Sequence, residues 1–286
     1  MSRRGRTVRG VLLAIAAFCI LPLNDAIAKF LVEQHTVPQL VWARLFFQSL
    51  VVTVWLSTTG QLTLSLGKKP GLVLIAVGAV WLANYPFFVA LRYMGLADAF
   101  ALVITAPLAV IVLCAVFLKE QVRYYHWLMV VVGFLGALVI VRPGHGVFQW
   151  AAVLPLLSAG LFAVYQVTIR KLTGTLAAPQ LLFLTSVPPM LGACMLLPWF
   201  WVTPEPMAWV LMAAMGMGAG FAHFLLIKSF ELAPASLIAP FMYVQLLSST
   251  LIGLLMFGDL PDAVTALGAS LIVGAGLCGL WLARRG

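Results

Sequence analysis

The stretch ADAFALVITAPLAVIVLCAVFL, residues 97–118, contains a single charged side chain, that of Asp98. A helix needs about 20 apolar residues to cross the hydrocarbon core of a bilayer. Membrane β-barrels instead alternate apolar and polar residues over short segments, and this sequence does not. We therefore predict an all-α integral membrane protein with ten transmembrane helices, at residues 10–31, 38–57, 71–91, 97–118, 125–142, 148–169, 178–200, 206–228, 234–257 and 263–283.

The composition excludes a soluble globular domain. Hydrophobic residues make up 63% of the chain, charged residues 9%, and the mean hydropathy is +1.09, whereas soluble domains carry roughly 25% charged residues. The formal net charge is +9. If the N-terminus lies inside, Lys and Arg concentrate in the inside connections, and the outside connections hold only Arg92 and Arg142. This distribution sets membrane orientation, so we expect both termini to be cytoplasmic and no nucleic-acid partner.

The second half of the sequence repeats the first. LADA at residues 96–99 is matched by LAPA at residues 232–235, and other matches follow at a nearly constant separation. We predict two inverted five-helix repeats, at residues 1–145 and 146–286. Inverted repeats are the usual architecture of alternating-access transporters, in which the substrate site lies at the repeat interface. A duplication that only builds a stable bundle or a channel is the alternative.

Three charged side chains fall deep inside predicted spans: Asp25 and Lys29 in the first, and Arg44 in the second. Charges at this depth are costly and are functional candidates. Asp25 and Lys29 are one helical turn apart, and Arg44 lies at a similar depth, so two cations can bracket one carboxylate. The cluster is either an internal salt bridge or a site that meets an anionic substrate group or couples a proton. The repeat counterpart of Asp25 is Gln166.

A second set of polar side chains lies inside the spans. Amides, phenols and imidazoles are costly against lipid, so most should face other helices or a wet cavity. Tyr243 and Gln245 are two residues apart, so at least one should face a neighbouring helix. A lone histidine such as His223 is more often a packing group than a proton carrier. The candidate substrate-binding residues are Asn84, Tyr85, Tyr165, Gln166, His223, Tyr243 and Gln245.

Proline and glycine mark further positions within the spans. A proline frees a backbone carbonyl and kinks a helix. Pro107 and Pro240 fall in the repeat-related fourth and ninth spans and are candidate hinges, with static bends as the alternative. Residues 216–220, GMGAG, lie in an apolar span. Small residues four apart are typical of helix packing, so we do not interpret this run as a phosphate loop.

Catalytic motifs are missing from the sequence. It has no His-Glu-x-x-His, no Gly-x-Ser-x-Gly and no Gly-x-x-x-x-Gly-Lys loop for ATP. We expect no enzyme activity, no metal and no cofactor; an intramembrane enzyme is the minor alternative. The expected partners are a small-molecule substrate, the lipid bilayer and a proton as candidate coupling ion, for a monomer or homodimer.

Several motifs resemble a known family. LRYMGLADA at 91–99, the Pro107 helix that ends in LKE at 118–120, and the helix with Gly133 and Gly136 resemble one EamA repeat. Three later motifs resemble the second EamA repeat: APAS at 233–236, PFMYVQ at 240–245 and FGD at 257–259. The resemblance, to the ten-helix EamA type of the drug/metabolite transporter (DMT) superfamily, covers nearly the whole chain. The family usually has Gly-Glu where this chain has Lys119-Glu120 and Gly258-Asp259.

This resemblance carries expectations of its own. Asp25-x-x-x-Lys29 followed by Trp42-Ala43-Arg44 is most similar to the branch that contains bacterial S-adenosylmethionine carriers. The family implies a central cavity lined by the first, third, fourth, sixth, eighth and ninth helices, in a bacterial inner membrane. We expect secondary active transport of small organic metabolites, such as amino acids, S-adenosylmethionine or similar amphipathic solutes. A passive facilitator or channel for such metabolites is the alternative.

Overall fold

The structure is a computed structural model that describes residues 3–60, 65–117, 124–141 and 150–285 of the 286-residue chain. The described residues form helices and connections without any strand, so the all-α prediction is confirmed for them. The LKE motif at 118–120 and the predicted repeat boundary at 145 lie outside the described residues.

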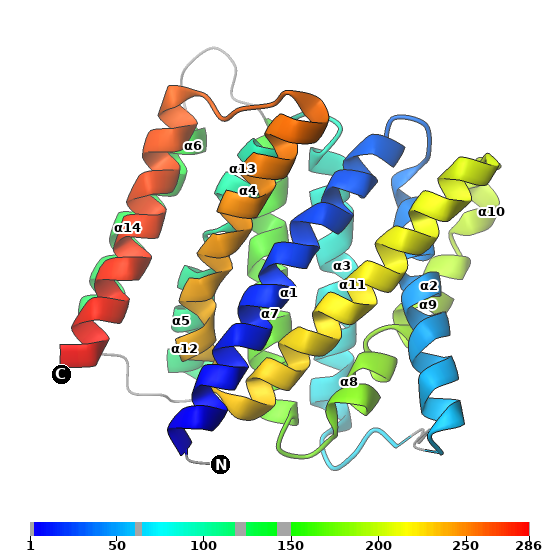
Figure 1. Cartoon of the computed structure of the whole chain (residues 1–286), viewed down its shortest axis with the longest axis horizontal. Helices are drawn as coiled ribbons and strands as arrows, with labels where there is room; N and C mark the ends of the chain where they lie inside the picture. Colours follow the sequence, from blue (N-terminus) through cyan, green and yellow to red (C-terminus); the bar gives the residue numbers. More distant parts are fainter. Residues whose placement is uncertain (1–2, 61–64, 118–123, 142–149, 286) are drawn as a thin grey trace.

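The helices pack side by side as a bundle (Figure 1). Their bounds are α1 (Arg3–Leu31), α2 (Val37–Thr58), α3 (Pro70–Ala90), α4 (Leu96–Val103), α5 (Ala106–Phe117), α6 (Tyr124–Val141), η1 (Trp150–Ala152), α7 (Val153–Leu172), α8 (Ala178–Leu184), α9 (Val187–Cys194), α10 (Leu197–Phe200), α11 (Pro206–Leu232), α12 (Ala235–Ile238), η2 (Ala239–Tyr243), α13 (Val244–Phe257) and α14 (Ala263–Arg285).

Six helical stretches are long and apolar enough to cross a membrane: Gly5–Leu31, Val37–Thr58, Pro70–Ala90, Leu96–Phe117, Trp150–Leu172 and Pro206–Leu232. Shorter apolar helices lie at Val131–Ile140, Phe241–Phe257 and Ala263–Ala275. Large apolar side chains such as Leu74, Leu247 and Leu255 are exposed on the outside of the bundle. Such a surface is suited to lipid, so the chain is a multi-pass membrane protein.

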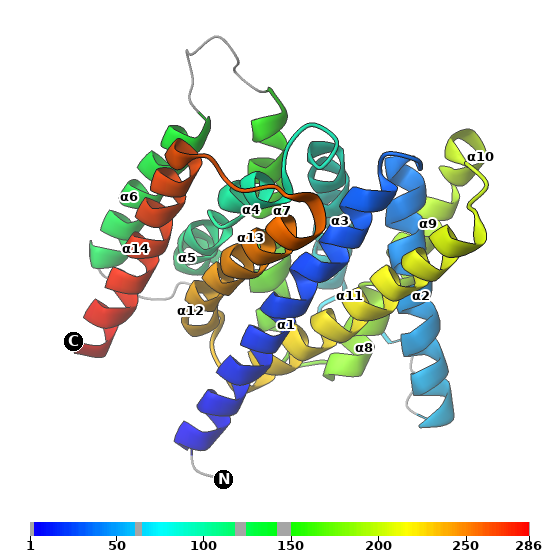
Figure 2. The ribbon, with the colours of Figure 1, turned by 45° about the horizontal axis from the view of Figure 1, so that its top comes forward.

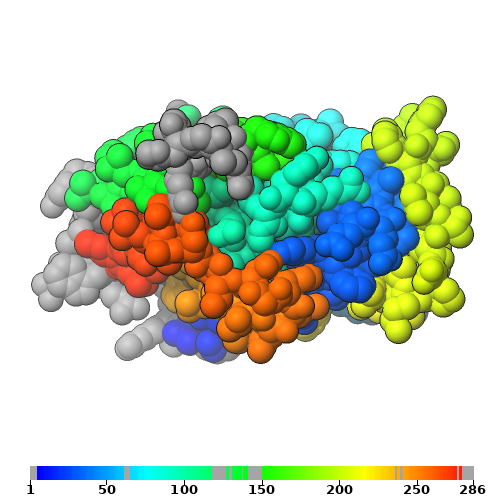
Figure 3. Space-filling view, turned by 90° about the horizontal axis from the view of Figure 1, so that it is seen from above, coloured from blue at the N-terminus to red at the C-terminus, as the bar shows by residue number. Residues whose placement is uncertain are grey.

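Helix pairing sets the shape of the bundle. α1 packs along α11, α3 packs along α7, and α6 packs along α14, while α2 flanks α11. The α6–α14 pair forms one edge in two views (Figures 1 and 2). Seen from above, the molecule is elongated, with α14 in red toward one side and the region of α10 in yellow-green at the other (Figure 3). The start of α1 and the end of α14 lie at the same end of the bundle (Figure 1).

Glycines let α11 approach its neighbours. A Cβ on Gly216 would lie 2.6 Å from Cβ of Phe47 in α2, and one on Gly220 would lie 3.0 Å from Cγ of Gln48. Gly218 faces the other way and contacts the side chain of Asn24 in α1. The packing role predicted for GMGAG is confirmed, because the run holds α11 between α1 and α2.

Several of the membrane helices are interrupted rather than continuous. The helix at 96–117 is interrupted at Ile104–Thr105, two residues before Pro107, and η2 interrupts the helix at 235–257 around Pro240. A further break at Thr185–Ser186 separates α8 from α9. Hydroxyl groups accompany two of these breaks: Thr105 donates to the carbonyl of Leu102 at 2.8 Å, and Thr185 to that of Leu181 at 2.8 Å. The same two carbonyls also accept the backbone N–H groups of Thr105 and Thr185, so each hydroxyl adds a second bond at the break.

Candidate functional site

Seven helical segments meet around a central cavity of about 60 Å³. Its polar lining residues are Asp25, Arg44, Asn84, Ser158, His223 and Gln245, and its apolar ones are Leu21, Val80, Ala83, Phe87, Phe100, Val103 and Phe162. They come from α1, α2, α3, α4, α7, α11 and α13. All six spans that the resemblance implied contribute, and α2 adds Arg44.

The cavity is small for a metabolite site. Small-molecule sites usually measure about 300–1,000 Å³, several times the volume found here. In this conformation the lining residues therefore surround a space that is too small for a metabolite. A solute the size of an amino acid or larger can enter only if the surrounding helices separate.

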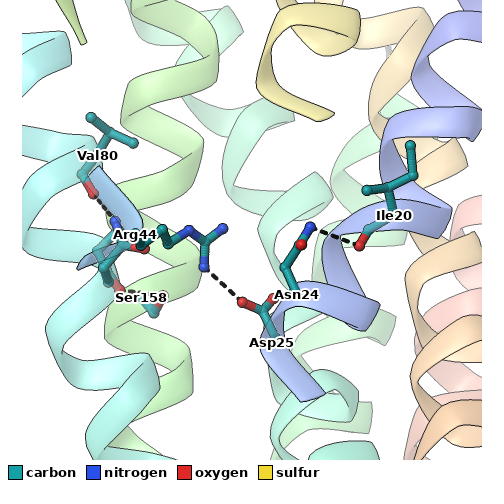
Figure 4. Close-up of polar contacts among 8 residues, drawn as sticks. Ile20, Asn24, Asp25, Arg44, Val80 and Ser158 are labelled. Atoms are coloured by element: carbon teal, nitrogen blue, oxygen red, sulfur yellow. Dashed lines mark hydrogen bonds and ion pairs between the residues drawn. The ribbon is translucent and has the colours of Figure 1, made fainter. Parts of the chain in front are cut away.

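An ion pair between α1 and α2 dominates the electrostatics of the cavity. Nη1 of Arg44 donates to Oδ1 of Asp25 at 2.7 Å, and the two side chains are only 7% and 8% exposed. Figure 4 shows Arg44 reaching toward Asp25 across the space between the two helices. The guanidinium also lies 5.7 Å from the ring centroid of Phe88. The predicted link between the first two helices is thus present, and the pair carries no net charge.

Lys29 does not join this pair. Its Nζ donates to Oδ2 of Asp259, in the connection between α13 and α14, and it lies 4.6 Å from the ring centroid of Phe257. The expected bracketing of Asp25 by two cations is therefore wrong. A lysine near a helix end extends its flexible stem toward a more polar environment, and Asp259 supplies a carboxylate there.

The position of Asp259 follows from the way α13 ends. Gly258 has φ +69°, a left-handed conformation that suits glycine at a helix C-terminus. Its N–H bonds the carbonyl of Leu254 at 3.1 Å, and the N–H of Asp259 bonds the carbonyl of Gly253 at 3.1 Å. The turn brings the Asp259 carboxylate back toward α1.

Two of the remaining polar groups of the cavity bond backbone carbonyls, one packs against a ring, and one has a side-chain nitrogen without a partner. Nδ2 of Asn84 donates to the carbonyl of Val80 at 2.5 Å, and the Ser158 hydroxyl donates across to the carbonyl of Ala83 in α3 at 2.8 Å. The His223 ring packs against Phe162, at 6.4 Å between centroids. Gln245 is 3% exposed, and its Nε2 has no hydrogen-bond partner within the part of the chain that the structure describes.

Four of the candidate substrate-binding residues do not line the cavity: Tyr85, Tyr165, Gln166 and Tyr243. Tyr85 accepts a bond from Nε1 of Trp81 at 3.1 Å, and Nε2 of Gln166 donates to Sδ of Met242 at 3.3 Å. Tyr165 is fully buried in the apolar core beside His223, and Tyr243 packs in a separate apolar cluster. Gln245 thus lines the cavity, whereas Tyr243, two residues earlier, does not.

Sequence reasoning missed the contribution of Ser158 and Phe162. These residues are four apart in α7, and Tyr165 follows at the next turn of the same face, so the spacing was an available signal. Nothing comparable in the sequence indicated that Phe87 and Phe100 line the cavity, because phenylalanine is common throughout the spans. Among the described residues, no three His, Cys, Asp or Glu side chains come together in a way that could hold a metal ion.

Comparison with known proteins identifies the family. The model of the EamA-like transporter family matches residues 8–142. The pseudopaline exporter CntI of Pseudomonas aeruginosa is 30% identical over 267 residues, which cover 92% of this chain and 93% of that protein. The chain belongs to the EamA-like transporter family. As the sequence motifs indicated, this assigns it to the drug/metabolite transporter superfamily.

Other relatives of this EamA-like transporter carry different solutes. The S-adenosylmethionine uptake transporter of Rickettsia prowazekii is 25% identical over 260 residues, covering 89% of this chain and 86% of its own. The riboflavin transporter of Vibrio cholerae is 26% identical over 281 residues, covering 96% and 93%. A crystal structure with 19% sequence identity covers 99% of both chains with a TM-score of 0.70, so the fold is the same. This EamA-like protein is therefore a transporter of small metabolites, not an enzyme.

Proposed function

We propose that the protein is a secondary active transporter that moves a small organic metabolite across a bacterial inner membrane by alternating access. The observation that carries the proposal is the central cavity, where a buried ion pair, amides and aromatic rings converge from both halves of the chain. Polar groups in the middle of a membrane are costly and are retained for function. The solutes named for the relatives, S-adenosylmethionine, pseudopaline and riboflavin, are the first candidates.

The helix pairing supports two inverted repeats with ten crossings. If residues 1–145 and 146–286 are equivalent, α1 corresponds to α7 and α3 to α11. Exchanging the halves then converts the α1–α11 pair into the α7–α3 pair, and both pairs are present. The shared location of both chain ends also suits an even number of crossings. The Lys and Arg distribution favours cytoplasmic ends.

The broken helices support a hinge in each half. In this proposal α4–α5 and α12–η2–α13 bend at the interruptions beside Pro107 and Pro240. Discontinuous helices at the midplane are common in transporters. Bending there separates the walls of the cavity on one side of the membrane at a time.

Uptake into proteoliposomes tests the proposal. S-adenosylmethionine, riboflavin and amino acids are supplied with and without a pH gradient. We expect at least one solute to accumulate above its outside concentration when a gradient is imposed. Equilibration without accumulation under every gradient would instead identify a passive facilitator.

Two variants of α3 link the transport to the cavity. Ala83→Phe places a ring in the cavity and should abolish uptake, while the matched control Leu74→Phe, at a side chain 65% exposed on the outside of α3, should not. Equal amounts of both variants in the membrane are confirmed before the comparison. Wild-type uptake by Ala83→Phe would show that the solute takes another route.

A further inference from the structure

The charges available to a solute in the cavity are few. Within the described lining, the charged carboxylate and guanidinium are those of Asp25 and Arg44, bonded to each other at 2.7 Å. The other cation expected there, Lys29, is engaged by Asp259 outside the cavity. The single imidazole of the lining, that of His223, packs beside the rings of Phe162 and Tyr165, which also contact each other. The site is therefore built around one positive and one negative charge.

Burial decides which solutes can interact with that pair. A charge removed from water is stable only when another charge or strong hydrogen bonds compensate it. Breaking a buried pair by removing one partner is strongly unfavourable, because the remaining charge is left alone. A solute with one charge that binds either Arg44 or Asp25 produces that situation. A solute with both charges does not.

We infer that the cavity selects solutes whose head group carries a carboxylate and a cationic amine close together, with the carboxylate on Arg44 and the amine on Asp25. This inference rests on the proposed transport function and specifies its substrate class. Such a head group exchanges one internal ion pair for two intermolecular ones, so every charge keeps a partner. Arg44 suits this role because its planar guanidinium can bind a carboxylate through two parallel bonds.

Two further features of the cavity fit the same class. Nε2 of Gln245 is buried without a partner among the described residues and is a ready donor for a carboxylate oxygen. The rings of Phe87, Phe100 and Phe162 line the rest of the space and favour an apolar or aromatic body attached to the charged head.

Three probes with one body test the charge requirement. Phenylalanine carries both charges, its methyl ester only the cation, and N-acetylphenylalanine only the anion. Their affinities for the purified protein in lipid nanodiscs are measured from ligand-induced shifts of the unfolding temperature. We expect phenylalanine to bind about tenfold or more tightly than either derivative, because truncating one partner of a buried charge pair costs at least this factor.

Charge-removing variants provide the sharper readout. In Asp25→Asn the cation of Arg44 is unpaired, and N-acetylphenylalanine should become the preferred probe. In Arg44→Gln the methyl ester should be preferred instead. The double variant Asp25→Asn/Arg44→Gln retains neither charge and should bind the three probes with similar affinity, which gives a reading even if a single variant does not fold. Lys29→Gln removes a cation from the same helix as Asp25 but outside the cavity. This control should keep the wild-type order of the three probe affinities.

The outcomes separate this inference from the transport proposal. Three results would overturn the zwitterion requirement. The wild-type protein could bind all three probes with equal affinity, it could fail to bind phenylalanine, or both single variants could keep the wild-type order of probe affinities. A zwitterion preference without uptake of any solute into proteoliposomes would retain the binding inference and reject secondary transport. Concentrative uptake without any preference among the charged probes would retain secondary transport and reject the binding inference.

Discussion

Replacing Gly216 by alanine should loosen the contact that holds Arg44 in place. The added Cβ would lie 2.6 Å from Cβ of Phe47 and 2.8 Å from the carbonyl oxygen of Arg44. Carbon atoms in contact prefer about 3.5–4.0 Å, so α2 must move away from α11 by roughly 1 Å. Overpacking of this kind costs about 1–3 kcal/mol. The 2.7 Å contact between Arg44 and Asp25 joins α2 to α1, so a shift of α2 should weaken it.

The effect of Gly216→Ala is measured as the unfolding temperature in detergent and the initial rate of uptake into proteoliposomes. At roughly 2–4 °C for each kcal/mol in a larger chain, the unfolding temperature should fall by about 2–12 °C, and uptake should fall with it. The matched control is Gly160→Ala in α7, where a Cβ would meet nothing within 4 Å. That change should be neutral or slightly stabilising, because alanine favours a helix by about 1 kcal/mol over glycine. Equal unfolding temperatures for the two variants would refute the packing argument.

Three further predictions concern other contacts. Lys29→Glu should lower the unfolding temperature by placing like charges together, and the exchange Lys29→Glu/Asp259→Lys should restore it; no recovery would mean that the pair is not a stabilising contact. Gly136→Val should destabilise the protein by about 1–3 kcal/mol, because even a Cβ there would lie 2.7 Å from the carbonyl of Gly268, and unchanged thermal unfolding would contradict this. Pro107→Ala should lower the maximal uptake rate while the KM stays within about twofold, since a hinge affects the conformational step; a changed KM alone would point to a binding role.

Much of the fold could be predicted from the sequence because a membrane imposes one simple rule. Every backbone polar group must be bonded inside the protein, so long apolar stretches become helices. The predicted span 206–228, for example, falls within α11, Pro206–Leu232. The positions of the helix breaks were harder to predict. α1 and α3 continue through Pro22 and Pro86. The unforeseen break at Thr185–Ser186 directly precedes α9, where Pro188 and Pro189 have no N–H to donate to the carbonyls four residues earlier.

The candidate site could be predicted in part. Charges stand out in an apolar sequence because each one is costly, and Asp25 and Arg44 do meet in the cavity. The face that each helix turns toward the cavity could not be predicted in the same way, because a helix that is apolar all round gives no indication of its inward face. Gln166 was therefore placed at the site, although it does not line the cavity and bonds Met242 instead. Tyr165 lies on the same face of α7 as Ser158 and Phe162 but beyond the residues that line the cavity.

The two ion pairs differ in a way that bears on the transport cycle. Asp25–Arg44 joins α1 and α2 and lies entirely within the first half of the chain, whereas Lys29–Asp259 joins α1 to the connection before α14 in the second half. If the halves move as units, relative motion leaves Asp25–Arg44 intact and strains Lys29–Asp259. The first pair can then remain assembled through the cycle and open only when a solute replaces its partners. The second must break whenever the end of the bundle that holds Asp259 opens, so the cost of breaking it limits how often that end opens without a solute.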